Sequence, residues 1–109
     1  MSNAASYVDA QSLPWRATPH PGVSWKKLRF DVASGESAVL LRFDPGASYA
    51  AHRHPGGEQY LVLEGSLEES GQTYGPMSYV HFPPGTSHRP SSRAGCVVFV
   101  VLPRPIEEL

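Results

Sequence analysis

The sequence has little cysteine, no long apolar run and no excess of charge, and each shortage excludes a class of protein. Its single cysteine, Cys96, excludes an internal disulfide framework and a zinc knuckle built from cysteines alone. The longest apolar run, Cys96 to Leu102, has seven residues and is too short to span a bilayer as a helix. With ten acidic and nine basic side chains, the sequence lacks the basic excess that is typical of nucleic-acid-binding proteins. We therefore expect a small cytoplasmic protein with no nucleic-acid partner and no membrane contact.

Helical periodicity is also missing. No stretch of twelve or more residues free of glycine and proline repeats its apolar residues with a 3.6-residue period. Ten glycines and eleven prolines instead divide the 109 residues into short runs. The 40% of hydrophobic residues is enough for one packed core, which excludes a disordered chain.

The order of these features predicts three parts. Residues 1–4 resemble an expression-vector remnant, and no signal-peptide pattern is present. Residues 5–22 are polar and broken by proline, which predicts an extended N-terminal arm that Trp15 anchors on the body of the domain. Residues 23–109 alternate short β-like runs with turn residues and form the predicted barrel.

Seven runs within this region are predicted strands. They are Ser24–Val32, Ala38–Phe43, Tyr49–His54, Gln59–Leu63, Ser66–Glu69, Ser78–Phe82 and Cys96–Leu102. Short strands separated by glycine and proline turns predict an all-β sandwich or barrel.

Two of these strands, Gln59–Leu63 and Cys96–Leu102, are apolar on both faces. A half-solvated antiparallel strand alternates between apolar and polar residues, so a second layer has to cover the outer face. We predict that a second copy of the chain provides it, which makes the protein a homodimer. The N-terminal arm is the alternative cover.

One segment carries a pattern typical of metal sites. His52 and His54 are two residues apart, so on a strand both side chains point to one face, where two imidazoles can bind one ion. Ser48 and Ala50 share that face and leave room for a ligand. A Pro-Gly-Gly turn then reverses the chain, and Glu58 begins the next strand with a carboxylate.

Two further features complete the predicted site. Tyr60 and Val62 lie on the face of Glu58 and are expected to form an apolar wall. His88 follows the tight turn Pro83-Pro84-Gly85, which holds its side chain in a defined direction.

These segments resemble the two motifs of the cupin superfamily. Gly46, His52, His54, Glu58 and Gly65 match every fixed position of the first motif. Pro83, Gly85 and His88 match the second motif. Two positions depart from the pattern: Met77 replaces a glycine, with Gly75 two residues earlier, and Ser92 replaces an asparagine. Neither position supplies a ligand, so the departures affect the expected turn geometry rather than the metal site.

The resemblance implies a double-stranded β-helix, the cupin jelly-roll barrel, with His52, His54, Glu58 and His88 as ligands of one divalent metal ion. Fe(II), Mn(II), Ni(II), Co(II), Cu(II) and Zn(II) all suit such ligands, and affinity order does not select among them. The alternative is a degenerate cupin whose histidines only form hydrogen bonds inside the barrel.

Within the cupins, the sequence is similar to the small ChrR-like group, which includes acetylacetone-cleaving dioxygenases and the C-terminal domain of zinc-containing anti-sigma factors. The similar segments are Trp15 to Val23, Leu40 to Gly46, Leu63 to Gly65, Pro83 to Gly85 and Gly95-Cys96. The resemblance implies either a metalloenzyme with dioxygenase-type chemistry on a small dicarbonyl or organic acid, or a non-catalytic cupin that senses a metal or small molecule. Tyr60 is the candidate hydrogen-bond or proton donor in the enzyme, with barrel packing as its alternative role.

The remaining polar residues and the cysteine have simpler interpretations. We expect His81 at the surface or an interface, His20 in a solvated loop, Cys96 as a small buried hydrophobic residue, Lys26, Lys27 and Arg29 on a solvated sheet edge, and Glu68, Glu69, Glu107 and Glu108 as surface charge.

Overall fold

A computed structural model describes residues 4–109, so most of the predicted vector remnant, residues 1–3, lies outside the described part of the chain. Its elements are η1 (Ala10–Ser12), β1 (Arg16–Ala17), β2 (Val23–Phe30), β3 (Ser37–Phe43), β4 (Ala47–Ser48), β5 (His52–His54), β6 (Glu58–Gly65), β7 (Leu67–Glu69), β8 (Gln72–Tyr74), β9 (Tyr79–Phe82), β10 (Thr86–His88), β11 (Ser91–Ser92), β12 (Cys96–Leu102) and β13 (Glu107–Glu108). Among residues 4–109, no helical segment has the length or apolar character needed to cross a membrane.

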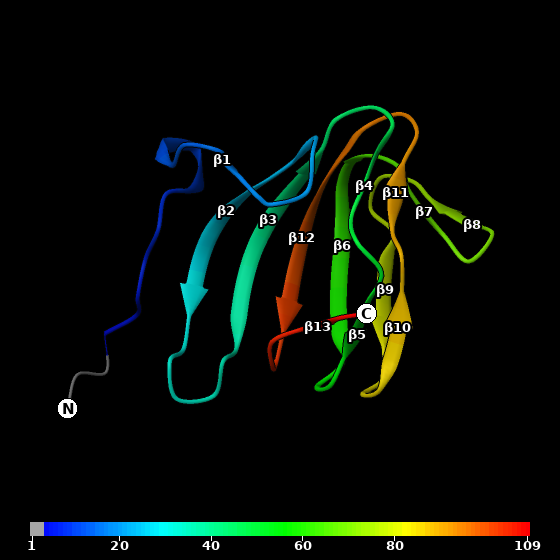
Figure 1. Ribbon diagram of the computed structural model, residues 1–109. Coiled ribbons are helices and arrows are strands. Elements are labelled where there is room, and N and C mark those ends of the chain that lie inside the picture. Colours follow the sequence, from blue (N-terminus) through cyan, green and yellow to red (C-terminus); the bar gives the residue numbers. More distant parts are fainter. Residues whose placement is uncertain (1–3) are drawn as a thin grey trace.

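The strands form a jelly-roll barrel of antiparallel sheets. The larger sheet has the order β1-β2-β3-β12-β6-β9, and two smaller sheets, β10-β5-β13 and β4-β11-β7-β8, complete the barrel. Figure 1 shows β2, β3, β12 and β6 side by side, with β13 and β5 in front of them. Since β5 follows β4 and precedes β6, the chain passes from one wall to the other at the predicted metal-binding segment.

The core lies between these walls and follows from strand alternation. In β12, Cys96, Val98 and Val100 are buried, and Val97 and Phe99 between them are only half-buried. The other buried hydrophobic residues are Val23, Val39, Phe43, Tyr60, Val62 and Leu67. Cys96 is thus a buried free thiol, as predicted, and burial raises its pKa.

Six of the seven predicted strands match observed strands to within two residues at each end. The predicted and observed bounds of β12 are identical, and those of β3 differ by one residue. The predicted strand Tyr49–His54 is wrong in its first half, because the chain leaves β4 at Ser48 and enters β5 only at His52. The sequence analysis missed six strands of two or three residues, which are too short to show a periodicity: β1, β4, β8, β10, β11 and β13.

The N-terminal arm extends the larger sheet. Its strand β1 pairs with β2, and Trp15 contacts the cationic side chains of Lys26 and Arg42, at 4.8 and 4.6 Å from the ring centre. The arm contributes no residue to the shallow groove on the outer face of β6, β9 and β12, which is lined by Leu61, Tyr79 and Phe99 among others.

The prediction of a solvated loop position for His20 is wrong. Only 13% of its side chain is exposed, and its Nε2 lies 2.9 Å from Oε1 of Glu108. Its ring packs on Tyr49 with the ring centres 4.0 Å apart. The C-terminal strand β13 is distant in sequence, so this burial could not be inferred from the sequence around His20.

Two turns show how the motif residues shape the barrel. Gly65 ends β6 with φ +70°, and a Cβ built on it would overlap the carbonyl oxygen of Gly95. Met77, which stands where the cupin pattern has glycine, also adopts a left-handed conformation, with φ +67°. Met77 therefore bears the steric cost that a Cβ brings in this region.

Candidate metal centre

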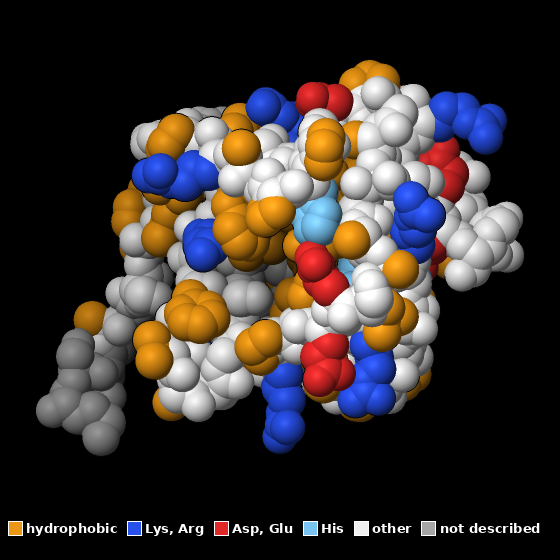
Figure 2. Space-filling model, in the orientation of Figure 1, with side chains coloured by type: hydrophobic (Ala, Val, Ile, Leu, Met, Phe, Trp, Pro, Cys, Tyr) orange, Lys and Arg blue, Asp and Glu red, His pale blue; other side chains and the backbone are white. Residues whose placement is uncertain are grey.

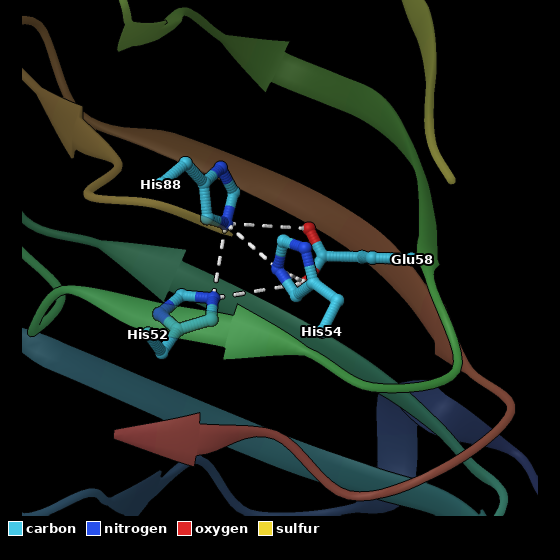
Figure 3. A group of neighbouring side chains, drawn as sticks. All are labelled: His52, His54, Glu58 and His88. Carbon is cyan, nitrogen blue, oxygen red and sulfur yellow. Dashed lines mark hydrogen bonds and ion pairs between the residues drawn. The ribbon is translucent and has the colours of Figure 1, made fainter. Parts of the chain in front are cut away.

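The four predicted ligand side chains meet inside the barrel, as Figure 3 shows. They come from three strands: His52 and His54 from β5, Glu58 from the start of β6, and His88 from the end of β10. In the antiparallel pair of β5 and β10, His88 lies directly opposite His52. The burial pattern of β5 is buried, exposed, buried, so both of its histidines point inward and Arg53 points outward.

The separations among the donor atoms fit a single ion. His88 Nε2 lies 3.0 Å from His52 Nε2 and 3.1 Å from His54 Nε2, and His54 Nε2 lies 3.1 Å from Glu58 Oε2. Two donors that each bind an ion at roughly 2.1 Å, at right angles to one another, are about 3.0 Å apart. The donor set therefore has the spacing as well as the chemistry of a divalent-metal site.

Hydrogen bonds on the outer side of each histidine determine which ring nitrogen carries the proton. The other ring nitrogen faces the centre of the site with its lone pair. The Nδ1 atom of His52 donates to the carbonyl of Ala50 at 2.8 Å. The Nδ1 atom of His54 donates to the hydroxyl oxygen of Thr86 at 3.2 Å, because that hydroxyl gives its own proton to the carbonyl of Pro83. In the neutral rings the Nε2 atoms then have no proton.

The third histidine, His88, donates its Nδ1 proton to Oε2 of Glu69 at 2.8 Å. Three Nε2 lone pairs and the carboxylate of Glu58 thus converge on one point within the barrel. Such a cluster of electron pairs is repulsive unless a cation lies among them. Either protons or a metal ion must supply that positive charge.

The pKa shifts agree with this view of the site. Burial alone would raise the pKa of Glu58, but hydrogen bonds from His52 and His54 and the positive charge of His54 and His88 lower that pKa to about 2. Burial alone would lower the pKa of His52, but its interactions with Glu58 and with the Ala50 carbonyl raise that pKa. Without a metal ion, protons are therefore held among the ligands.

The prediction that Glu69 is a surface charge is wrong. It is only 5% exposed, and its carboxylate lies next to His88 inside the barrel. The strand period contained the signal, because Leu67 points into the core and the residue two positions later shares its face. Glu68, between them, is only half-buried.

Tyr60 lies in the same interior wall and is 2% exposed. Its hydroxyl donates to Oε2 of Glu69 at 3.1 Å. Burial, followed by the charge of Glu69 and the hydrogen bond to it, raises the pKa of Tyr60 far above its ordinary value. The phenol therefore keeps its proton at neutral pH.

An apolar cavity of about 80 Å³ adjoins the four ligands. That volume accommodates roughly five to eight water-sized groups. Its wall comes mainly from Val39, Leu41, Phe43, Val98 and Val100 of the larger sheet. Among the described residues that line it, none is a lysine or an arginine.

The expected small residues do not line this cavity. Tyr49 does so instead of Ser48 or Ala50, because the chain between β4 and β5 is not a strand and does not alternate. The ring of Tyr49 packs edge-on against His52, with the ring centres 5.2 Å apart. Tyr49, which the sequence analysis did not place in the cavity, thus lies in the break between β4 and β5, which the sequence analysis did not predict either.

The C-terminal segment covers one side of the site. Ile106 lines the cavity, and the strand β13 pairs with β5 at Arg53 and His52. Figure 2 shows histidine atoms beside an acidic side chain in the middle of this face, with hydrophobic side chains around them. The segment joins the ligand strand to His20 through Glu108.

Comparisons with known proteins agree with the fold. Residues 3–104 match the family described as the ChrR cupin-like domain. No curated protein matches the chain.

Three solved structures are similar in fold. A proposed acetylacetone dioxygenase from Methylibium petroleiphilum PM1 has a TM-score of 0.93 and 19% identity, over 100% of this chain and 83% of that chain. An acetylacetone dioxygenase from Acinetobacter johnsonii has a TM-score of 0.91 and 19% identity, over 100% and 80%. A chain of the complex of SigE with the anti-sigma ChrR from Rhodobacter sphaeroides has a TM-score of 0.73 and 23% identity, over 86% and 50%.

Proposed function

The chain belongs to the ChrR cupin-like domain family, and on that basis we propose that it binds one divalent metal ion through His52, His54, Glu58 and His88. The observation that supports this most strongly is that His88 Nε2 lies 3.0 and 3.1 Å from the Nε2 atoms of His52 and His54, beside the ionised carboxylate of Glu58. The identity of the ion, among iron, zinc, manganese, nickel, cobalt and copper, is a matter for measurement.

For the activity, we propose dioxygenase-type chemistry on a small dicarbonyl or organic acid. When bound, a divalent ion would act as a Lewis acid toward the substrate oxygens and, as iron, would supply electrons for the reduction of O₂. The fold is similar to that of the acetylacetone dioxygenase from Acinetobacter johnsonii. The apolar cavity beside the ligands supports a small substrate with little charge.

The lining of the cavity favours the dicarbonyl over the organic acid. A carboxylate substrate needs a cationic or hydrogen-bonding partner for its charge. The described lining offers no lysine or arginine, so no cationic side chain of the cavity would compensate that charge. The apolar side chains Leu41, Phe43 and Ile106 would exclude water from the bound substrate and hold its alkyl groups.

The role of Tyr60 as a hydrogen-bond or proton donor to the substrate stays a prediction. The residue lines the cavity, but its hydroxyl proton is directed to Glu69. A substrate oxygen would have to compete with that carboxylate for the proton.

Elemental analysis of protein purified without a metal-chelating column tests the proposal. We expect about one metal ion per chain, and loss of that ion in His52→Ala, because the variant lacks one of the four donors. His81→Ala, which removes an exposed histidine of β9, is the control and should keep the ion. Bound iron followed by oxygen uptake with a panel of diketones would support the dioxygenase. A wild-type protein that neither contains nor takes up a divalent ion would refute the metal site.

A non-catalytic sensor of metals or small molecules is the second candidate. It is supported by the family itself and by the similarity to a chain of the SigE–ChrR complex. Stoichiometric zinc without oxygen uptake on any diketone would favour this function over the enzyme.

We also propose that the protein is a homodimer through the outer face of β6, β9 and β12. The half-buried Leu61 and Phe99 and the 61% exposed Tyr79 line a shallow groove there, which the N-terminal arm leaves open. Light scattering coupled to size exclusion should give twice the chain mass. Tyr79→Glu should shift the protein to a monomer, whereas a wild-type monomer would refute the dimer.

A further inference from the structure

Glu69 stands out among the acidic residues, since it is buried without being one of the four ligands. Its side chain is 2% exposed. A carboxylate in such a place loses its hydration, which costs several kcal/mol unless other groups compensate. The compensation comes from two donors to the same oxygen, Oε2: the Nδ1 atom of His88 at 2.8 Å and the hydroxyl of Tyr60 at 3.1 Å.

We infer that Glu69 is a positioning residue of the metal site, which holds His88 so that Nε2 faces the ion, and that Tyr60 in turn holds Glu69. The inference rests on the proposed metal site. It gives Tyr60 a function in the interior wall that requires no contact with a substrate.

A comparison of the three histidines shows why this contact matters most. The acceptors behind His52 and His54 are a neutral carbonyl and a neutral hydroxyl, whereas the acceptor behind His88 is a carboxylate. A carboxylate behind a histidine fixes its tautomer and makes the opposite nitrogen a stronger ligand. His88 is therefore the ligand whose binding strength depends most on its outer partner.

Ring packing limits the other movements of His88. The ring of Phe82 lies against that of His88, with the centres 4.7 Å apart, and the ring of Tyr60 stacks on Phe82 at 6.3 Å. The ring of His88 is thus confined by Phe82, while Glu69 selects its direction. Tyr60 contacts both Phe82 and Glu69, the two residues that hold His88.

The net charge of the site changes as well. With Glu58 alone, a divalent ion leaves a net charge of +1 in an apolar interior. The carboxylate of Glu69 adds a second negative charge next to a ligand, so the buried assembly is neutral as a whole. A neutral assembly is less costly to bury than a charged one.

The test is the binding of Co(II) by the metal-free full-length protein, measured in competition with a chromophoric chelator and by the visible absorption of the bound ion. Glu69→Gln keeps the size of the side chain and removes its charge. We expect its affinity for Co(II) to fall by about 10- to 100-fold and its absorption bands to shift, because His88 loses its charged partner. Tyr60→Phe should lower the affinity less, since it leaves the carboxylate in place.

Glu68→Gln is the matched control, because Glu68 precedes Glu69 on the same strand and lies on the opposite face. Its affinity for Co(II) should equal that of the wild type. Circular dichroism and thermal unfolding of the metal-free proteins show whether each variant is folded; if Glu69→Gln is not, Tyr60→Phe and the conservative Glu69→Asp take its place.

The failures of the two proposals can be told apart. If the wild type binds Co(II) and folded Glu69→Gln binds it with the same affinity and spectrum, Glu69 has only a packing role and the inference is wrong. If the wild type binds neither Co(II) nor another divalent ion, the metal site itself is wrong and the inference is lost with it.

Discussion

At the scale of single residues, each histidine of the site uses its two ring nitrogens for different purposes. The Nδ1 atoms donate outward, to Ala50, Thr86 and Glu69, and the Nε2 atoms face one another. The arrangement gives each ring one tautomer before any ion binds. In the metal-free protein, interactions with Glu58 and the Ala50 carbonyl raise the pKa of His52, so this histidine binds a proton more readily than a free imidazole does.

Metal binding should therefore depend on pH. The pKa of His52 lies above its ordinary value of 6.5 in the metal-free protein, so affinity is full above the raised pKa and is lost as the pH falls through it. Glu58, with a pKa of about 2, stays ionised over this range and contributes no pH dependence.

Titrations with Co(II) between pH 8 and pH 5 measure this effect. Below the raised pKa, affinity should fall by about tenfold per pH unit for each proton displaced. His81→Ala should show the same profile, since His81 is exposed and pairs with Gln59, on the opposite face of the sheet from Glu58. An affinity that does not change across this range would contradict the proton competition.

At the scale of elements, two short strands carry three of the four ligands. Both β5 and β10 have three residues, and each places its histidines by pairing with the other. Strands of this length are stable only as parts of a larger sheet. The turns that join the longer strands therefore fix the positions of the ligands.

The turn at Met77 leads to a stability prediction. Met77 has φ +67° and is 71% exposed, so its Cβ strains the backbone while its side chain packs little. Met77→Gly removes that strain but makes the unfolded chain more flexible. We expect a net rise of about 0.5–1 kcal/mol in the free energy of unfolding.

Urea unfolding of the metal-free protein measures this change. Gly65→Ala is the contrasting variant, because a Cβ there would overlap the carbonyl of Gly95, and it should be clearly destabilised. A Met77→Gly protein less stable than the wild type would show that the methionine side chain makes contacts that outweigh the strain.

At the scale of the whole molecule, the N-terminal arm and the C-terminal segment meet beside the metal centre. The 2.9 Å contact between Nε2 of His20 and Oε1 of Glu108 joins the N-terminal arm to β13, and Ile106 lines the cavity beneath. The ligand strand β5 lies between β10 and β13, so it depends on the C-terminal segment for one of its two partners.

Removal of residues 103–109 should open the cavity. The truncated protein loses the cover of Ile106 and the partner of β5, so a bound ion should transfer to a chelator several-fold faster than from the wild type. Stopped-flow transfer of Co(II) to a chelator measures the rate. Glu107→Gln removes only an exposed ion pair with Arg53, worth at most about 1 kcal/mol, and should not change it. Equal transfer rates for the truncated and wild-type proteins would mean that the ion leaves by another path.

The sequence alone determined the all-β architecture and the bounds of β12, because strand alternation acts over a few residues. Its resemblance to the two cupin motifs predicted the convergence of His52, His54, Glu58 and His88, which the structure confirms. Only the tertiary structure decided the burial of His20 and the contact of Glu69 with His88. The burial of a polar side chain depends on which distant segment packs against it. The sequence around a glutamate on a short strand does not show whether its carboxylate faces a histidine or water.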